Sequence, residues 1–391
     1  MVHDNNSKES AFKFIILLGI VSLLADVTYE GARSITGPYL ALLGASGTVV
    51  GIVAGLGELV GYALRFVSGY IADRTKRYWL LTIFGYAVNL LAVPFLALAG
   101  RWEAAAALMI SERIGKAIRS PSRDAMLSHA TKEIGRGWGF GIHEAMDQIG
   151  ALLGPLIVAA VLYVKGGYKM SFGILIIPAI LALSVLLVAR RLYPKPQNLE
   201  PKTIPIEAKG FPRIFWIYLV AIMLVAAGYV DFPLIAYHFK KFSIASDNWI
   251  PVFYAIAMGV DALAALIFGR LFDLKGLSIL IVASLISALF APLVFLGNFS
   301  SALFGVVLWG IGMGAQESIM RAAIAGMISP DKRASAYGIF NAGYGLFWFL
   351  GSAIMGIFYD ISIPALIVFS VIAQLASIPF FMMTKRAIGK K

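Results

Sequence analysis

Hydrophobic residues occur in long runs along this chain, separated by short polar segments. Most runs reach about 20 residues, enough for a helix to cross a hydrocarbon core of roughly 30 Å. Lipid offers no partners to backbone N–H and C=O groups, so such runs must be helical, and the alternation expected of barrel strands is absent. We predict twelve spans, with approximate ends, at 11–43, 47–71, 78–99, 103–120, 138–164, 170–192, 213–239, 248–272, 277–297, 301–328, 334–359 and 363–384. The first carries charges in its second half and lacks a small-residue cleavage site, so we expect a retained helix rather than a secretory signal.

The composition supports the same class of protein. Of 391 residues, 60% are hydrophobic and 14% are charged, and a soluble protein of this size needs more charged surface than that. The chain has no cysteine, which excludes disulfides, thiolate metal sites and cysteine nucleophiles. The sequence therefore predicts an all-α membrane protein with 12 transmembrane helices.

The net charge of +12 is distributed unevenly between alternate loops. With a cytoplasmic N-terminus, Arg and Lys number about 22 on the cytoplasmic side and about 5 outside, as the positive-inside rule requires. The outside set is Arg101, Lys165, Lys169, Lys240 and Lys241, whereas the inside set includes Arg123. We interpret the charge as a topology signal, not a nucleic-acid site. We expect a multi-pass protein of the cell membrane with both termini in the cytoplasm.

The chain contains an internal repeat. Gly69 and Asp73 close the second predicted span, and Gly269 and Asp273 close the eighth in the same spacing. A second set of matches follows, in which Arg136, Gly141, Ala145 and Gly154 correspond to Arg333, Gly338, Ala342 and Gly351. Parallel repeats of six spans are a known transporter architecture. Since the polar, proline-rich stretch 193–212 lies at the midpoint, we predict a bundle over 1–192, a cytoplasmic linker over 193–212 and a bundle over 213–391.

The end of the second span has the spacing Gly69-x-x-x-Asp73-Arg74-x-x-Arg77. It resembles the loop 2–3 signature of the major facilitator superfamily, although Lys76 replaces the usual glycine. The resemblance implies the fold of that family, two pseudo-symmetric six-helix bundles, and a conformational latch at Asp73. Such a carboxylate can hold a neighbouring helix terminus in one conformation and release it in another. The alternative is that the basic residues only enforce topology.

The fifth span contains Gly150-Ala-Leu-Leu-Gly154-Pro155, which is similar to the fifth-helix motif of family exporters that exchange substrate for protons. Small residues four apart permit close helix contact, which is also a generic packing device, and Pro155 allows a bend. Arg113 falls where such exporters carry a membrane-embedded arginine. The run from Ser111 to Ala125 looks like a subgroup of bacterial and archaeal members, some associated with drug or nickel efflux.

Charges within the spans are expensive and are candidates for function. Asp26, Glu30 and Arg33 share one face of the first helix. Two carboxylates one turn apart repel when both are ionised, so we expect one of them to carry a proton, unless Arg33 neutralises Glu30 as a structural pair. Asp231 lies near the repeat offset from Glu30, so we expect the two to face each other across the central cavity. The other substrate or proton-coupling candidates are Glu112, Arg113, Glu144, Asp147, Glu317 and Arg321.

Two further groups of polar residues have open interpretations. Glu112, Lys116, Arg119 and Arg123 form a stripe on the fourth helix. The alternative for its inner members is that they are plain interface residues. His143 and Asp147, at i and i+4, can relay protons or bind a metal together with a residue such as His238. The alternative is a packed, hydrogen-bonded histidine, and we predict no metal site.

Sequence motifs for catalysis or ATP hydrolysis are lacking. Gly115-Lys116 is followed by Ala117 where a phosphate loop needs Ser or Thr, and no HExxH or GxSxG motif occurs. We therefore expect no cofactor, no catalytic residues, and an ion gradient as the energy source. The predicted function is a proton-coupled exporter of a small amphipathic or cationic solute, monomeric, with the bilayer, its small-molecule or ion substrate and protons as partners. The alternatives are divalent-metal efflux and a non-transporting membrane sensor.

Overall fold

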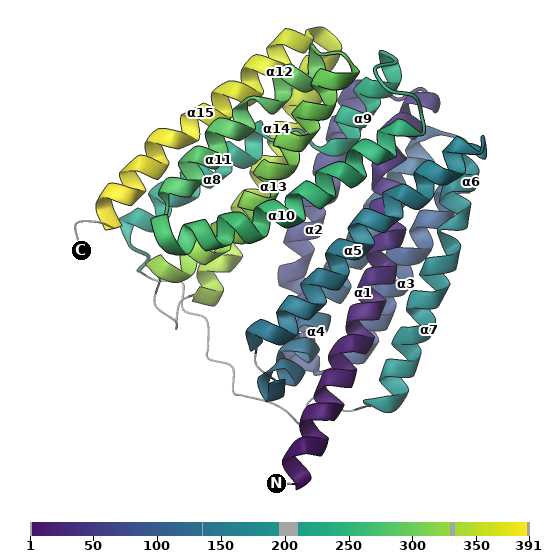
Figure 1. The fold of residues 1–391 in the computed structure, drawn as a ribbon, viewed down its shortest axis with the longest axis vertical. Helices are drawn as coiled ribbons and strands as arrows, with labels where there is room; N and C mark the ends of the chain where they lie inside the picture. Colours follow the sequence, from purple (N-terminus) through teal and green to yellow (C-terminus); the bar gives the residue numbers. More distant parts are fainter. Residues whose placement is uncertain (1, 135, 195–209, 329–332, 389–391) are drawn as a thin grey trace. The chain divides into compact units, whose positions relative to one another are not determined.

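The protein is described by a computed structural model over residues 2–134, 136–194, 210–328 and 333–388 (Figure 1). Every regular element within these ranges is a helix. Most of the predicted linker, 195–209, lies outside the described residues, so its location stays a prediction. Contacts divide the chain into two compact units, and the division falls inside two helices rather than at the linker alone.

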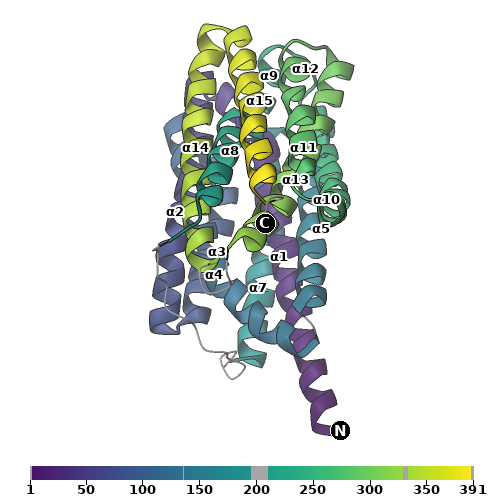
Figure 2. The ribbon, with the colours of Figure 1, turned by 90° about the vertical axis from the view of Figure 1, so that its left-hand side faces the viewer.

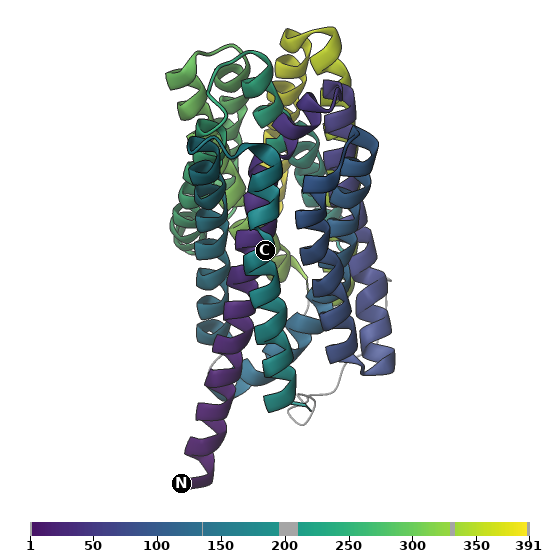
Figure 3. The ribbon, with the colours of Figure 1, turned by 90° about the vertical axis from the view of Figure 1, so that its right-hand side faces the viewer.

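Unit 1 comprises Met1–Ser34 and Val60–Thr203. Its helices are α3 (Tyr78–Phe95), the short η1 (Leu96–Leu98), α4 (Trp102–Ile134), α5 (Arg136–Tyr163), α6 (Gly167–Ile174) and α7 (Ile176–Leu192), together with most of α1 (Val2–Leu42) and the second half of α2 (Gly47–Thr75). The first turns of α1 extend beyond the end of α7 (Figures 1 and 3).

Unit 2 comprises Ile35–Leu59 and Ile204–Lys391. Its helices are α8 (Arg213–Gly228), α9 (Phe232–Lys241), α10 (Trp249–Lys275), α11 (Ser278–Ala288), α12 (Phe290–Phe295), α13 (Phe299–Met327), α14 (Arg333–Ile361) and α15 (Ile363–Ile388). α8 lies beside both α14 and α15 (Figure 2). The last turns of α1 and the first turns of α2 also belong to this unit, which links the start of the chain to its second half.

Eleven helical stretches in the described part of the chain are long and apolar enough to span a membrane, which agrees with eleven of the twelve predicted spans. The exception is α4, which corresponds to the predicted fourth span. Its charged residues lower its hydropathy, and the bundle buries them: Glu112 is 8% exposed and Arg119 is 1% exposed. The charges of α4 face the interior of the protein and not lipid, which explains why a helix of low hydropathy fits among the apolar ones. The sequence prediction of an all-helical membrane fold is confirmed.

The helix α4 runs past the predicted end of the fourth span at residue 120 and continues through Pro121 to Ile134. A proline within a helix has no N–H to give to the carbonyl four residues earlier, here that of Ala117. The hydroxyl of Ser68 in α2 donates to this Ala117 carbonyl at 2.7 Å. The orphaned acceptor is therefore satisfied from a neighbouring helix, and α4 does not need to end.

Candidate functional site

Two glycines of α5 bring that helix into backbone contact with α1. A Cβ atom on Gly150 would overlap the carbonyl oxygen of Leu23 and would lie 2.8 Å from Cβ of Asp26. A Cβ atom on Gly154 would overlap the carbonyl oxygen of Val27 and would lie 2.8 Å from the nitrogen of Gly31. The Gly150–Gly154 pair, with Pro155 directly after it inside α5, thus allows the close approach beside the turns that carry Asp26 and Glu30.

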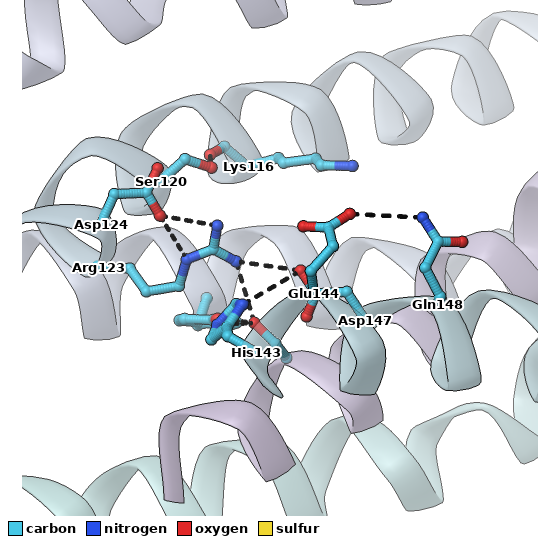
Figure 4. Close-up of polar contacts among 10 residues, drawn as sticks. Lys116, Ser120, Arg123, Asp124, His143, Glu144, Asp147 and Gln148 are labelled. Carbon is cyan, nitrogen blue, oxygen red and sulfur yellow. Dashed lines mark hydrogen bonds and ion pairs between the residues drawn. The ribbon is translucent and has the colours of Figure 1, made fainter. Parts of the chain in front are cut away.

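Four residues from three helices form a ring of polar contacts, which we call the charged ring: Ser22, Arg123, His143 and Asp147. Arg123 Nη1 donates to Ser22 Oγ at 3.0 Å and lies 4.0 Å from Asp147 Oδ2. His143 closes the ring, since its Nε2 lies 3.0 Å from Ser22 Oγ and its Nδ1 lies 3.5 Å from Asp147 Oδ2. The ring joins α1, α4 and α5 (Figure 4).

Arg123 has a second acidic partner outside the ring. Its Nε and Nη2 atoms lie 2.9 and 2.8 Å from Asp124 Oδ1 (Figure 4). The sequence analysis counted Arg123 among the charges of the cytoplasmic side and also in the stripe on the fourth helix, and the structure has it within α4. The guanidinium of Arg123 sits between two carboxylates, where it compensates their charge.

Two further cations of α4 lie against aromatic rings. Lys116 Nζ lies 4.0 Å from the ring centroid of Tyr29, and Arg119 Cζ lies 4.2 Å from that of Tyr86. Nε and Nη1 of Arg119 have no hydrogen-bond partner among the described residues. The negative ring faces therefore supply part of the stabilisation that this buried guanidinium needs.

Asp26 lies beside the charged ring and is 6% exposed. Its charged neighbours are Asp147, Lys116 and Glu30, and its Oδ1 has no hydrogen-bond partner within the described residues. Burying several carboxylates together is tolerated only when cations or protons compensate them. The cluster is thus nearly charge-balanced, and the gain or loss of one proton changes that balance.

Other predicted residues of unit 1 lie apart from the charged ring. Glu112 is paired with Arg113, whose Nε lies 3.2 Å from Glu112 Oε2, and Asn89 Nδ2 donates to Glu112 Oε1 at 2.6 Å. Glu144 is exposed and accepts a hydrogen bond from Gln148 at 3.4 Å (Figure 4). Arg33, on the same helix as Asp26, is only partly buried.

In unit 2 the predicted span 213–239 is broken between α8 and α9 at Tyr229, Val230 and Asp231. The break leaves backbone carbonyls without helical donors. Trp309 Nε1 donates to the Val230 carbonyl at 2.9 Å, and Ser370 Oγ donates to the Gly228 carbonyl at 2.6 Å. Interrupted helices with satisfied backbone are typical of transporter binding regions.

Asp231, the residue that precedes α9, is 3% exposed among aromatic side chains. Trp348 Nε1 donates to Asp231 Oδ2 at 3.3 Å. The ring of Trp348 lies 5.4 Å from that of Tyr344 and 5.6 Å from that of Tyr229. In contrast, Glu317 is exposed, and the side chain of Arg321 lies outside the described part, so the roles predicted for these two residues stay predictions.

The two copies of the repeated motif lie at the C-terminal ends of α2 and α10. Asp73, Arg74 and Arg77 are exposed, as is Asp273, whereas Gly69 and Gly269 are partly buried. Lys76, which stands where the family motif usually has glycine, has a φ of 54°, and the next residue after α10, Gly276, has a φ of 59°. The positive φ explains the glycine preference, because a Cβ atom is unfavourable in this region.

The two histidines considered for a metal lie in different units. His143 is part of the charged ring, and His238 Nδ1 lies 3.1 Å from the hydroxyl oxygen of Tyr359. Over the described ranges, no group of three or more His, Asp and Glu side chains could hold a metal ion. Each histidine is instead packed and bonded to protein groups.

Comparison with known proteins agrees with this architecture. Two segments of the chain, residues 18–232 and 214–390, match the Major Facilitator Superfamily. The chain belongs to this superfamily. The two matches cover the two halves of the predicted repeat, and the resemblance stated from the motifs is confirmed.

Relatives and solved structures span nearly the whole chain. An uncharacterised protein of Mycobacterium tuberculosis is 42% identical over 376 residues, covering 94% of this chain and 92% of that protein. An uncharacterised transporter of this superfamily from Methanocaldococcus jannaschii is 26% identical over 372 residues, 92% of each chain. The crystal structure of a point mutant of the nucleoside transporter NupG superimposes with a TM-score of 0.76 at 15% identity, covering 94% of this chain and 100% of the other. At that identity the likeness concerns the fold alone, and as a member of the superfamily this protein has the architecture of a secondary transporter that works by alternating access.

The sequence analysis missed three members of the buried network, namely Ser22, Tyr29 and Tyr86. It did predict the stripe of Lys116, Arg119 and Arg123 on α4 from the spacing, but the partners of these residues come from other helices. Serine and tyrosine carry no charge signal in a hydrophobic run, so nothing in the sequence distinguished them from packing residues.

Proposed function

We propose that this protein is a proton-coupled exporter of a small amphipathic or cationic solute, acting as a monomer in the cell membrane with both termini in the cytoplasm. The observation that carries this proposal is the charged ring of Ser22, Arg123, His143 and Asp147 with Asp26 beside it. The transporter family and fold support transport rather than catalysis.

Proton coupling follows from the chemistry of this cluster. Ionisable groups in a membrane interior are costly and are typical of proton pathways. Asp26 and Asp147 are carboxyl groups that interact with each other and share cations from α4. Taking up a proton on either carboxyl group would free a cation of α4 to shift. Such a change provides a means to link protonation to movement of α1, α4 and α5.

Export is supported by the place of the antiporter-type motif. Gly150 and Gly154 pack on α1 at the turns that carry Asp26. Any rearrangement of the α1–α5 contact would therefore alter the surroundings of the proposed proton site. This relation gives the motif a physical role in exchange of protons for substrate.

The substrate class is supported by Asp231 in unit 2. Its carboxylate accepts a hydrogen bond from Trp348, whose ring packs against those of Tyr344 and Tyr229. A carboxylate and aromatic ring faces both attract cations, and the rings accept apolar groups. This combination suits a solute that is both cationic and apolar.

The test uses proteoliposomes with an imposed pH gradient and ethidium as a fluorescent lipophilic cation. We expect the native protein to accumulate ethidium against its gradient. Asp26→Asn and Asp147→Asn should each lose this pH-driven accumulation and keep exchange at equal pH. Asp247→Asn, which changes a partly buried ion pair with Lys240 outside the charged ring, is the matched control and should behave as the native protein does. Native pH dependence in both network variants would rule out the cluster as the coupling site.

A further inference from the structure

The start of α2 is held by the last turn of α14. The backbone N–H of Gly47 donates to Asp360 Oδ1 at 3.0 Å, and that of Thr48 donates to Asp360 Oδ2 at 2.7 Å. Both carboxylate oxygens are thus used to cap two of the free N–H groups that every helix start exposes. The positive end of the helix dipole adds to the attraction.

Glycines allow the two backbones to meet directly beside this cap. A Cβ atom on Gly51 would lie 2.9 Å from Cα of Gly356, and one on Gly55 would lie 2.8 Å from Cβ of Ser352. Thr48 Oγ1 also donates to the Gly356 carbonyl at 3.3 Å. α2 and α14 are therefore in contact over at least two turns, with Asp360 at the end of the contact.

We propose that Asp360 is a latch that keeps the transporter closed on the side of the membrane where α2 begins. Helix α2 changes partners along its length, since Gly47 to Leu59 pack in unit 2 and Val60 to Thr75 pack in unit 1. Alternating access requires the two six-helix repeats, of which α2 belongs to the first and α14 to the second, to separate at one side of the membrane at a time. Opening at this end must therefore detach the start of α2 from α14, and the two hydrogen bonds to Asp360 must break.

The start of α2 keeps a cap of its own when Asp360 leaves. Ser46 Oγ accepts a hydrogen bond from the Val49 N–H at 3.3 Å. Asp360 is exposed at the helix end, so water can solvate both the carboxylate and the freed N–H groups. The contact can open and close without melting the first turn of α2, which is what a reversible latch needs.

The other end of α2 carries Asp73, which is exposed in this structure, while Asp360 is engaged. The two carboxylates act at opposite ends of one helix and hence on opposite sides of the membrane. The latch proposed for Asp360 depends on neither proton coupling nor the substrate.

Cysteine labelling tests the latch without any substrate. The native chain has no cysteine, and Ala45, directly before Ser46, is 5% exposed. In Ala45→Cys, purified in detergent, a polar maleimide should react slowly. Adding Asp360→Ala should raise the labelling rate by about 3- to 30-fold, the range expected when a capping side chain is lost.

Two further variants make the result specific. Asp360→Asn keeps one acceptor oxygen and should give a smaller increase in labelling rate than Asp360→Ala. Size-exclusion profiles and thermal unfolding of both variants would detect misfolding. Asp247→Ala removes a partly buried carboxylate of unit 2 that is paired with Lys240, far from α2 in the sequence, and should leave the rate unchanged. An unchanged rate in well-folded Asp360→Ala, or an equal increase in Asp247→Ala, would overturn the proposal.

Discussion

Arg123 Nη1 lies 4.0 Å from Asp147 Oδ2 and joins α4 to α5 inside unit 1. The same nitrogen donates to Ser22 on α1, so a single guanidinium bridges three helices. A buried bridge of this kind makes each partner depend on the others for its charge compensation. The consequences can be measured directly.

Arg123→Ala should destabilise the protein by about 1–3 kcal/mol, because Asp147 loses a cation and Ser22 loses a donor. Thermal unfolding of the purified protein measures this as a lower melting temperature. The double variant Arg123→Ala with Asp147→Asn should lose less stability than the sum of the losses in the two single variants, since the second change removes the uncompensated charge. Simple additivity of the two losses would mean that the groups are not coupled.

Gly154→Ala should destabilise the protein by about 1–3 kcal/mol, because the added methyl group overlaps the Val27 carbonyl. Gly141→Ala on the same helix is the matched control, since nothing lies within 4 Å of a Cβ atom there. That control should be neutral or slightly stabilising, as alanine favours helix more than glycine does. Equal melting temperatures for the two variants would contradict the close approach of α5 to α1.

Lys76→Gly should stabilise the protein by about 1 kcal/mol, because it removes a side chain from a backbone with φ of 54°. At the corresponding position of the repeat, Gly276→Ala should destabilise by a similar amount. Chemical denaturation or thermal unfolding compares the two. A loss of stability in Lys76→Gly would show that contacts of the lysine outweigh the backbone cost.

Asp73→Asn should preserve expression but shift the conformational balance in the direction opposite to Asp360→Ala. Asp73 acts at the other end of α2. Weakening its contacts therefore favours the state in which Asp360 accepts the hydrogen bonds from the start of α2. In the Ala45→Cys background the maleimide reaction should therefore slow, and the variant carrying both changes should return toward the parent rate. If Asp73→Asn leaves labelling and transport unchanged, the latch role inferred from its motif is refuted.

The sequence by itself determined that the chain is helical, membrane-embedded and a member of its superfamily. Crossing lipid requires about 20 apolar residues whose backbone is bonded within the same helix, so each span is visible locally. The latch motif around Asp73 and the glycines at 150 and 154 are local in the same way. Even Lys76 could be assigned to a glycine position before its φ was known.

Only the tertiary structure decided which polar groups meet. The spacing placed Arg123 in a stripe on the fourth helix, but its partners Ser22 and Asp147 come from α1 and α5. The Ser68 hydroxyl that satisfies the Ala117 carbonyl also comes from another helix. Thr48 and Asp360, which form the proposed latch, are separated by 312 residues. Helix formation depends on hydrogen bonds between residues four apart, whereas charge compensation and helix capping between helices depend on which faces pack together. That packing is set by side-chain shape throughout both units, and no local pattern records it.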